Sequence, residues 1–193
     1  MTTDHTHPSV LVLGKSQRVI DDAVADLREL GYEAEATNDF FSDVPSRFDP
    51  KQIDLVVFGG QVPPDRKTEL KEQISAINPQ VTFVQGLAGI PGLIADQVRQ
   101  SLDGEQLIPG QAPTYDAARR AIVLSLFAPL DVNVTAYWIT ETVPPDPKSD
   151  SRVLFDDRLP AGEHAFALPD DINLDAAFAT VRAPNARWSF RLT

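Results

Sequence analysis

The chain has 193 residues, 42% of them hydrophobic, and its 17 Lys and Arg against 28 Asp and Glu leave a formal net charge of −11. This length can bury one large core or two small ones, and the negative charge opposes anionic partners, so we expect neither nucleic acid nor a membrane as partner. The absence of cysteine excludes disulfides, thiolate nucleophiles and cysteine-ligated metals.

The start of the chain, MTTDHTHPS, has neither the cationic region nor the apolar stretch of an export signal. The sequence also has no apolar run long enough to cross a bilayer. We therefore expect a cytoplasmic protein in which residues 1–8 form a disordered tail.

Residues 9–104 alternate between short apolar runs and segments with helical spacing. The apolar runs predict buried strands at 10–14, 33–37, 55–59 and 81–86. Gly31 and Gly104 are placed to end the first and last helices, whereas Pro45 limits the second to a short helix. The alternation predicts parallel strands joined by right-handed crossovers, with helices on both faces and the strand order 2-1-3-4.

The pattern changes at the polar, proline-bearing segment GEQLIPGQAPTYD. We expect residues 105–116 to be a linker and residues 117–193 to form a second domain, in which apolar and polar residues alternate. Turn sequences such as PPDPKSD, LPAG and APNA separate its short strands and predict an antiparallel sandwich. The predicted fold class is α/β plus all-β, with a small parallel doubly wound domain followed by an antiparallel β-sandwich.

The strand and helix pattern of residues 9–104 resembles the receiver domains of bacterial response regulators, which have a flavodoxin-like fold. In that family an acidic pair after the first strand holds magnesium, and an aspartate at the end of the third strand accepts a phosphoryl group. Here Gly14, Lys15 and Ser16 follow the first strand. The third strand ends in Phe58, Gly59 and Gly60, where the acceptor aspartate would stand. The resemblance therefore implies a pseudo-receiver that cannot be phosphorylated.

The remaining reactive positions of the receiver family are also replaced. Gln85 and Gly86 stand where a hydroxyl residue follows the fourth strand, and the family's lysine has no counterpart in EQLIPG. Asp54 cannot substitute for the missing acceptor, because it begins the third strand and so belongs to the opposite edge of the sheet.

Three loops follow strand carboxyl ends on one edge of the predicted sheet, where open α/β sheets bind ligands. Their candidate ligand-binding residues are Gly14, Lys15, Ser16, Gly59, Gly60, Gln61, Gly86 and Gly89. Lys15 would supply a cation, and the glycines would let backbone N–H groups approach a small anion. The alternative is that these glycines serve tight turns and close helix packing.

Known phosphate-binding motifs are not satisfied by these loops. The GKS at 14–16 lacks the first glycine of a P-loop, because Ser9 stands there and the intervening residues form a strand. GLAGIPG lacks the dinucleotide-binding spacing and follows the wrong strand. Because no nucleophile, base and orienting group can be placed together, we predict no catalytic residue, no metal site and no cofactor.

Residues 134–169 resemble the immunoglobulin-like modules of flagellar hook-capping and secretion-associated proteins, in which a strand pair, an L-P-A-G-x-H turn and a return strand recur. This resemblance implies an immunoglobulin-like sandwich and carries no activity. Within residues 117–193 we expect the polar side chains of His164, Asp156, Asp157, Asp170 and Asp171 to serve turns and the surface. We expect Trp138 and Trp188 to lie in the sandwich core.

Two functions remain open. The first is a non-enzymatic regulatory or interaction protein, in which the pseudo-receiver is joined to a sandwich that binds a protein partner or a second copy. The alternating C-terminal run RWSFRLT suggests an edge strand, and we expect a homodimer. The second is a small-anion-binding or nucleotide-binding α/β protein, or an enzyme, that uses the strand carboxyl ends and has the sandwich as a dimerisation element or lid.

Overall fold

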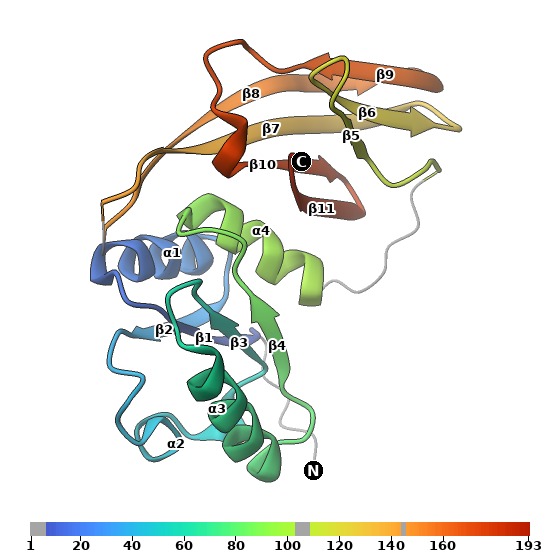
Figure 1. The fold of residues 1–193 in the computed structure, drawn as a ribbon. Helices are drawn as coiled ribbons and strands as arrows, with labels where there is room; N and C mark the ends of the chain where they lie inside the picture. Colours follow the sequence, from blue (N-terminus) through green and yellow to red (C-terminus); the bar gives the residue numbers. More distant parts are fainter. Residues whose placement is uncertain (1–6, 103–108, 144–145) are drawn as a thin grey trace. The chain divides into compact units, whose positions relative to one another are not determined.

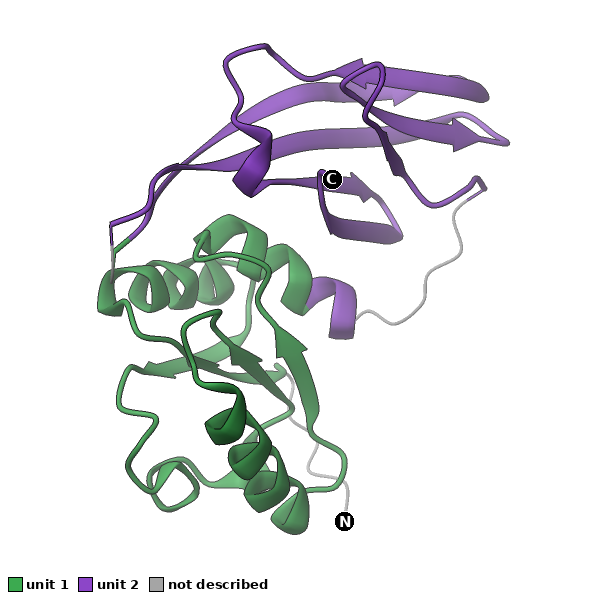
Figure 2. Cartoon of the chain, in the orientation of Figure 1, with its two compact units in different colours: residues 1–98, 144–146 green, residues 99–143, 147–193 purple. Residues whose placement is uncertain are grey.

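A computed structural model of the chain describes residues 7–102, 109–143 and 146–193 (Figure 1). They belong to two compact units, residues 1–98 with 144–146 and residues 99–143 with 147–193 (Figure 2). Most of the expected tail, and the expected helix stop at Gly104, fall outside the described residues.

The first unit contains a four-stranded parallel sheet in the order β2-β1-β3-β4, which confirms the predicted order. Its strands are β1 (Ser9–Leu13), β2 (Glu33–Thr37), β3 (Leu55–Phe58) and β4 (Thr82–Gln85). Its helices are α1 (Gln17–Glu29), α2 (Val44–Arg47), α3 (Pro64–Ile77) and α4 (Pro91–Leu102), with a short 3₁₀ turn η1 (Pro50–Gln52). The last turn of α4, from Arg99 on, belongs to the second unit. Figure 1 shows α1 and α4 on one face of the sheet and α2 and α3 on the other. Over the described ranges, no helix has the length and apolarity that a membrane span requires.

Helix α1 ends at the glycine that the sequence predicts, and its start is capped by Ser16, which we had expected to serve a ligand loop. The Ser16 hydroxyl accepts a hydrogen bond from the Val19 N–H at 3.2 Å, which satisfies one of the free donors of the first turn. Gly31 has φ +88°, and the Tyr32 N–H donates to the Leu27 carbonyl, so the chain leaves the helix through a left-handed glycine.

The core of the α3 face is built from the strands and one side of that helix. Leu11, Leu13 and Phe58 from the strands pack with Leu70 and Ile74 of α3, and all five are at most 1% exposed. Each side chain of this size contributes about 2 kcal/mol when fully buried. The short α2 has a proline in its first turn, in accordance with the prediction that Pro45 limits this helix.

The second unit consists of two antiparallel sheets with the orders β11-β10-β7-β8 and β5-β6-β9. The strands are β5 (Thr114–Asp116), β6 (Ala121–Leu126), β7 (Leu130–Glu141), β8 (Lys148–Leu159), β9 (Gly162–Ala167), β10 (Ala177–Ala183) and β11 (Ala186–Arg191), with a 3₁₀ turn η2 (Leu174–Ala176). Strand β5 pairs with β6, although its residues lie in the segment that we expected to be a linker.

The two antiparallel sheets share one hydrophobic core. Alternate residues of β6 and β7 point into it, among them Ile122, Leu124, Val134 and Trp138, which are at most 6% exposed. Trp188 packs against this core from β11 and remains partly exposed. Trp138 therefore lies in the core as expected, whereas Trp188 covers the core at its margin.

Candidate functional site

The parallel order brings the carboxyl ends of β1, β3 and β4 side by side, because β3 lies between the other two. The candidate residues that follow these ends therefore share one edge of the sheet. Whether that edge can hold a ligand depends on how the three loops pack.

In the first loop, Gly14 is needed for close packing of α1 against the sheet. A Cβ atom at Gly14 would lie 2.7 Å from the Cγ2 atom of Ile20, closer than real Cβ contacts. The Gly14 N–H donates to the Thr37 carbonyl at 3.3 Å, so it continues the pairing of β1 with β2. Lys15 is exposed and Ser16 is buried as the α1 cap, so Lys15 is the accessible polar side chain of this loop.

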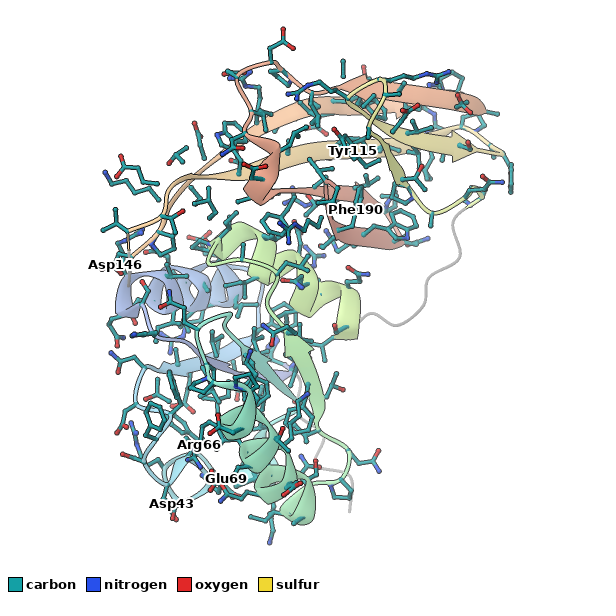
Figure 3. All side chains as sticks on the ribbon, viewed as in Figure 1. Asp43, Arg66, Glu69, Tyr115, Asp146 and Phe190 are labelled. Carbon is teal, nitrogen blue, oxygen red and sulfur yellow. The ribbon has the colours of Figure 1, made fainter. Side chains whose placement is uncertain are left out.

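The cap residue Ser16 also donates from its hydroxyl to the carboxylate of Asp146, which belongs to the same compact unit and is labelled in Figure 3. A negative charge is favourable at the N-terminus of a helix, where free N–H groups and the helix dipole attract anions. Ser16, which we expected to take part in binding an external ligand, is thus bonded to a carboxylate of the chain itself.

The second loop lies directly against the first. The Gly59 N–H donates to the Leu13 carbonyl at 2.7 Å, and a Cβ atom at Gly59 would lie 3.1 Å from that oxygen and 3.3 Å from the Gly14 Cα. Gly60 differs from its neighbour, because nothing lies within 4 Å of a Cβ built there. Gln61 is exposed and takes part in an interaction of its own. The Gly59 bond therefore continues the pairing of β3 with β1 by one residue, and only Gly59 is crowded by it.

The third loop uses its polar groups internally. The Phe58 carbonyl accepts from the Gly86 N–H at 2.9 Å and from the Gln85 Nε2 at 3.0 Å. The Gln97 side chain of α4 donates to the Gln85 carbonyl at 3.1 Å and accepts from the Leu87 N–H at 3.0 Å. Gly89 is partly buried in the turn before α4. The backbone N–H of Gly86 and the carboxamide and carbonyl of Gln85 therefore already have hydrogen-bond partners within the unit.

The position that corresponds to the phosphoryl acceptor of receivers is part of the hydrophobic core. Phe58 is 1% exposed, and its ring stacks on Phe83 with centroids 6.0 Å apart and an interplanar angle of 19°. The Lys71 ammonium of α3 lies 5.8 Å from both ring centroids, within cation–π range. Asp54 lies just before β3, where its carboxylate accepts from the Ser9 N–H at 2.7 Å. Over the described ranges, no group of three His, Cys, Asp or Glu side chains could hold a metal ion.

Sequence reasoning missed a polar network that follows the carboxyl end of β2. Asp39 accepts from the Ser42 hydroxyl at 2.6 Å and from the Arg47 guanidinium at 3.1 Å. The Ser42 hydroxyl and, less strongly, the charge of Arg47 hold the pKa of Asp39 below its ordinary value. The three-residue spacing of Asp39 and Ser42 is a turn signal that could have identified this contact.

The loop that carries this network is braced by a nearly buried arginine. Arg66, in the first turn of α3, donates to the Phe40 carbonyl at 2.6 Å and to the Ser42 carbonyl at 2.9 Å. Its guanidinium also pairs with Glu69 at 2.6 Å, and Figure 3 labels both residues. The sequence offered no sign of this role, because Arg66 reads as one more charged residue of an exposed helix.

Three of the polar residues of the second unit that the sequence singled out make contacts within that unit. His164 contacts the Pro160 carbonyl through Nε2 at 2.8 Å, as expected for a turn residue. Asp157 accepts from the next backbone N–H at 2.7 Å. Asp171 pairs with Arg152 at 3.0 Å, and this hydrogen bond holds the pKa of Asp171 below its ordinary value.

Comparisons with known proteins do not assign this chain to a family. No family model matches the sequence, and no curated protein matches it. Among solved structures, one match is a protein of Thermoplasma acidophilum that is provisionally named as part of a GMP synthase. It is 14% identical, the match covers 97% of this chain and 84% of that chain, and the TM-score is 0.31. A similarity at this level carries no argument about fold or function.

Proposed function

We propose that this protein is a non-enzymatic regulatory or interaction protein, built from a pseudo-receiver unit that cannot be phosphorylated and an immunoglobulin-like sandwich that binds a protein. The observation that carries the proposal is the buried Phe58, 1% exposed, at the position of the receiver family's phosphoryl acceptor. Next to it, the Gly59 N–H donates to the Leu13 carbonyl and continues the pairing of β3 with β1, and a Cβ at Gly59 would lie 3.1 Å from that carbonyl, so a larger residue does not fit there without a shift.

The pseudo-receiver part is supported by what occupies the acceptor position. A buried Phe58 stacked on Phe83 has no group that could accept a phosphoryl group. The first loop presents Gly14, Lys15 and Ser16, none of which is a carboxylate for magnesium.

The immunoglobulin-like part is supported by the strand arrangement. In chain order the first, second and fifth strands form one sheet, and the third, fourth, sixth and seventh form the other. Immunoglobulin-type sandwiches also separate the first, second and fifth strands from the third, sixth and seventh. The fourth strand, β8, pairs with β7 instead of joining the first group.

The small-anion hypothesis keeps one supporting observation, which is the open space at Gly60 beside the exposed Lys15 loop. In that case the sandwich would act as a dimerisation element or lid. The two functions differ in one measurable respect, because only the second requires a ligand that stabilises the folded protein.

The experiment combines phosphorylation with ligand screening. The protein is incubated with acetyl phosphate and magnesium and its intact mass is measured, and we expect no added phosphoryl group. A mass increase that a single Asp→Asn substitution in residues 9–102 removes would overturn the pseudo-receiver.

The same preparation is screened by thermal shift against phosphate, nucleotides, sugar phosphates and carboxylates. We expect no compound to raise the Tm. A compound that does so, and whose affinity falls at least tenfold in Lys15→Ala, about 1.4 kcal/mol, would establish the anion-binding function instead.

A further inference from the structure

The edges of the sheets differ in how their backbone groups are satisfied. The outermost strand of a sheet turns every second residue's N–H and C=O away from its neighbour, and such open groups can pair with another chain. The two units have six edge strands, which are β2 and β4, β8 and β11, and β5 and β9.

The β4 edge is capped by one side chain of α4. The Thr82 and Gly86 N–H groups donate to β3 and the residue before it, so the backbone groups of Gln85 and Leu87 point outward. The Gln97 carboxamide donates to the Gln85 carbonyl and accepts from the Leu87 N–H, at 3.1 and 3.0 Å. A single side chain therefore satisfies an acceptor and a donor that a further strand would need.

Two other edges carry caps from helix side chains. On β2, the outward carbonyl of Ala34 accepts from the Arg28 Nε at 3.0 Å. On β11, the Leu192 N–H donates to β10, so the odd-numbered Ser189 turns its N–H outward, and the Gln100 Oε1 accepts it at 3.1 Å. The edge that the C-terminal sequence suggested for self-pairing is thus capped near its middle.

The long β8 edge is protected locally. Two outward N–H groups, those of Ser151 and Arg158, each donate to the carboxylate of the preceding aspartate at 2.7 Å. The strand also has an irregularity in its register opposite Val134 and Thr135, and charged residues occupy much of its length. Bulges and charges are features that keep natural edge strands from pairing.

Strand β9 differs from these edges. The Leu168 N–H donates to the Arg120 carbonyl, and the register with β6 then turns the backbone of Glu163, Ala165 and Ala167 outward. All three residues are exposed, and within the described ranges no side chain is bonded to their backbone groups. The opposite edge, β5, is only three residues long and follows Pro113, which has no N–H.

We propose that two copies of this chain associate by pairing their β9 strands antiparallel, about a two-fold axis through Ala165. In that register Ala165 faces Ala165 of the partner subunit, and Glu163 faces Ala167 of the partner subunit. Three residue pairs that each exchange two backbone hydrogen bonds give about six bonds between the two copies. The pairing joins the two three-stranded sheets into one continuous sheet.

The sequence of β9 fits a second copy of itself. No like charges face each other in this register, because Glu163 lies opposite an alanine and already pairs with Arg119 at 3.6 Å. Ala165 and Ala167 offer small side chains that do not obstruct the approach of a second backbone. A two-fold interface needs such self-complementarity, since the same strand supplies both sides. The pairing extends the proposed interaction role and depends only on the second unit. Its test is therefore independent of the test for the pseudo-receiver.

The absence of cysteine makes a direct test available. In the proposed register the two Ala165 Cα atoms lie about 5.5 Å apart, which is within the range of a disulfide. We expect Ala165→Cys to form a covalent dimer under mild oxidation at micromolar concentration. The matched control is Val153→Cys, an exposed position on the β8 edge, which we expect to remain largely monomeric on a denaturing gel.

A second variant tests the same contact without cross-linking. Ala165→Lys places two positive charges at the axis, and we expect its dimer dissociation constant in sedimentation velocity to rise at least tenfold, whereas Val153→Lys leaves it unchanged. Circular dichroism checks that both variants are folded. A wild-type protein that stays monomeric up to high micromolar concentration would overturn the proposal, and so would a dimer that Ala165→Lys does not weaken.

Discussion

Gly59 and Gly60 are adjacent in sequence, yet the structure predicts opposite effects of the same substitution. A methyl group at Gly59 would lie 3.1 Å from the Leu13 carbonyl oxygen and 3.3 Å from the Gly14 Cα. Both neighbours are backbone atoms, which cannot rotate away as a side chain can. At Gly60 a methyl group would meet nothing within 4 Å, and the backbone there is not in the positive-φ region that favours glycine.

The expected magnitudes follow from these two environments. Overpacking against a fixed backbone costs about 1–3 kcal/mol, so we expect Gly59→Ala to lower the free energy of unfolding by about 2 kcal/mol. Gly60→Ala reduces the freedom of the unfolded chain without native strain, which stabilises by about 0.4–1 kcal/mol. At about 2–4 °C per kcal/mol, the Tm should fall by about 4–8 °C in the first variant and rise by about 1–4 °C in the second.

The assay is thermal and urea unfolding of the wild type and both variants, followed by circular dichroism. Near-equal Tm values for the two variants, or a greater loss in Gly60→Ala, would refute the reasoning that the β1 and β3 loops are packed backbone to backbone. The same result would reopen the strand ends as a ligand site.

Three further substitutions test other contacts. Arg66→Ala removes a nearly buried guanidinium that donates to two backbone carbonyls, and we expect the free energy of unfolding, measured in urea, to fall by about 3 kcal/mol. Arg66→Lys should be destabilised similarly, because an ammonium lacks the forked donors of a guanidinium. Gln97→Ala removes the side-chain partner of one donor and one acceptor on the β4 edge, and we expect the free energy of unfolding to fall by about 1 kcal/mol. We also expect light scattering to increase on heating, because the uncapped edge can pair with other chains. Burial, with smaller effects of Glu29 and Asp22, raises the pKa of Asp26, so its ionised form disfavours folding. Asp26→Asn should therefore raise the Tm at pH 7, and the gain should disappear below about pH 4, where the unfolded aspartate is also protonated.

The predicted elements of the first unit were set by local pattern. The apolar run VLVLG and the stop at Gly31 predicted where β1 lies and where α1 ends, because strand burial and helix termination act over a few residues. The cap at Ser16 was not predicted, because that residue was interpreted as part of a ligand loop. The strand order followed from the alternation of strands and helices, since right-handed crossovers leave few arrangements. The antiparallel layout of the second unit was predicted from two-residue alternation, which is also a local pattern because it marks strands with one buried face.

The sequence could name the candidate loop residues but could not decide between a ligand site and a packed turn. Gly14, Gly59 and Gly60 are identical as letters, and only the distances around each reveal that two are crowded and one is open. Strand β5 was missed because three residues beside a proline-bearing segment carry too little periodicity to be recognised.

Contacts between residues distant in sequence required the tertiary structure. Arg66 braces a loop more than twenty residues away, and Gln97 caps a strand edge through its side chain, and neither interaction leaves a repeating pattern along the chain. Hydrophobic periodicity reports which face of an element is buried, but it does not report which polar side chain meets which backbone group. For that reason the sequence by itself determined the two-part fold. Only the packed structure decided which glycines are crowded, which edges are capped and that, among the described residues, no side chain caps β9.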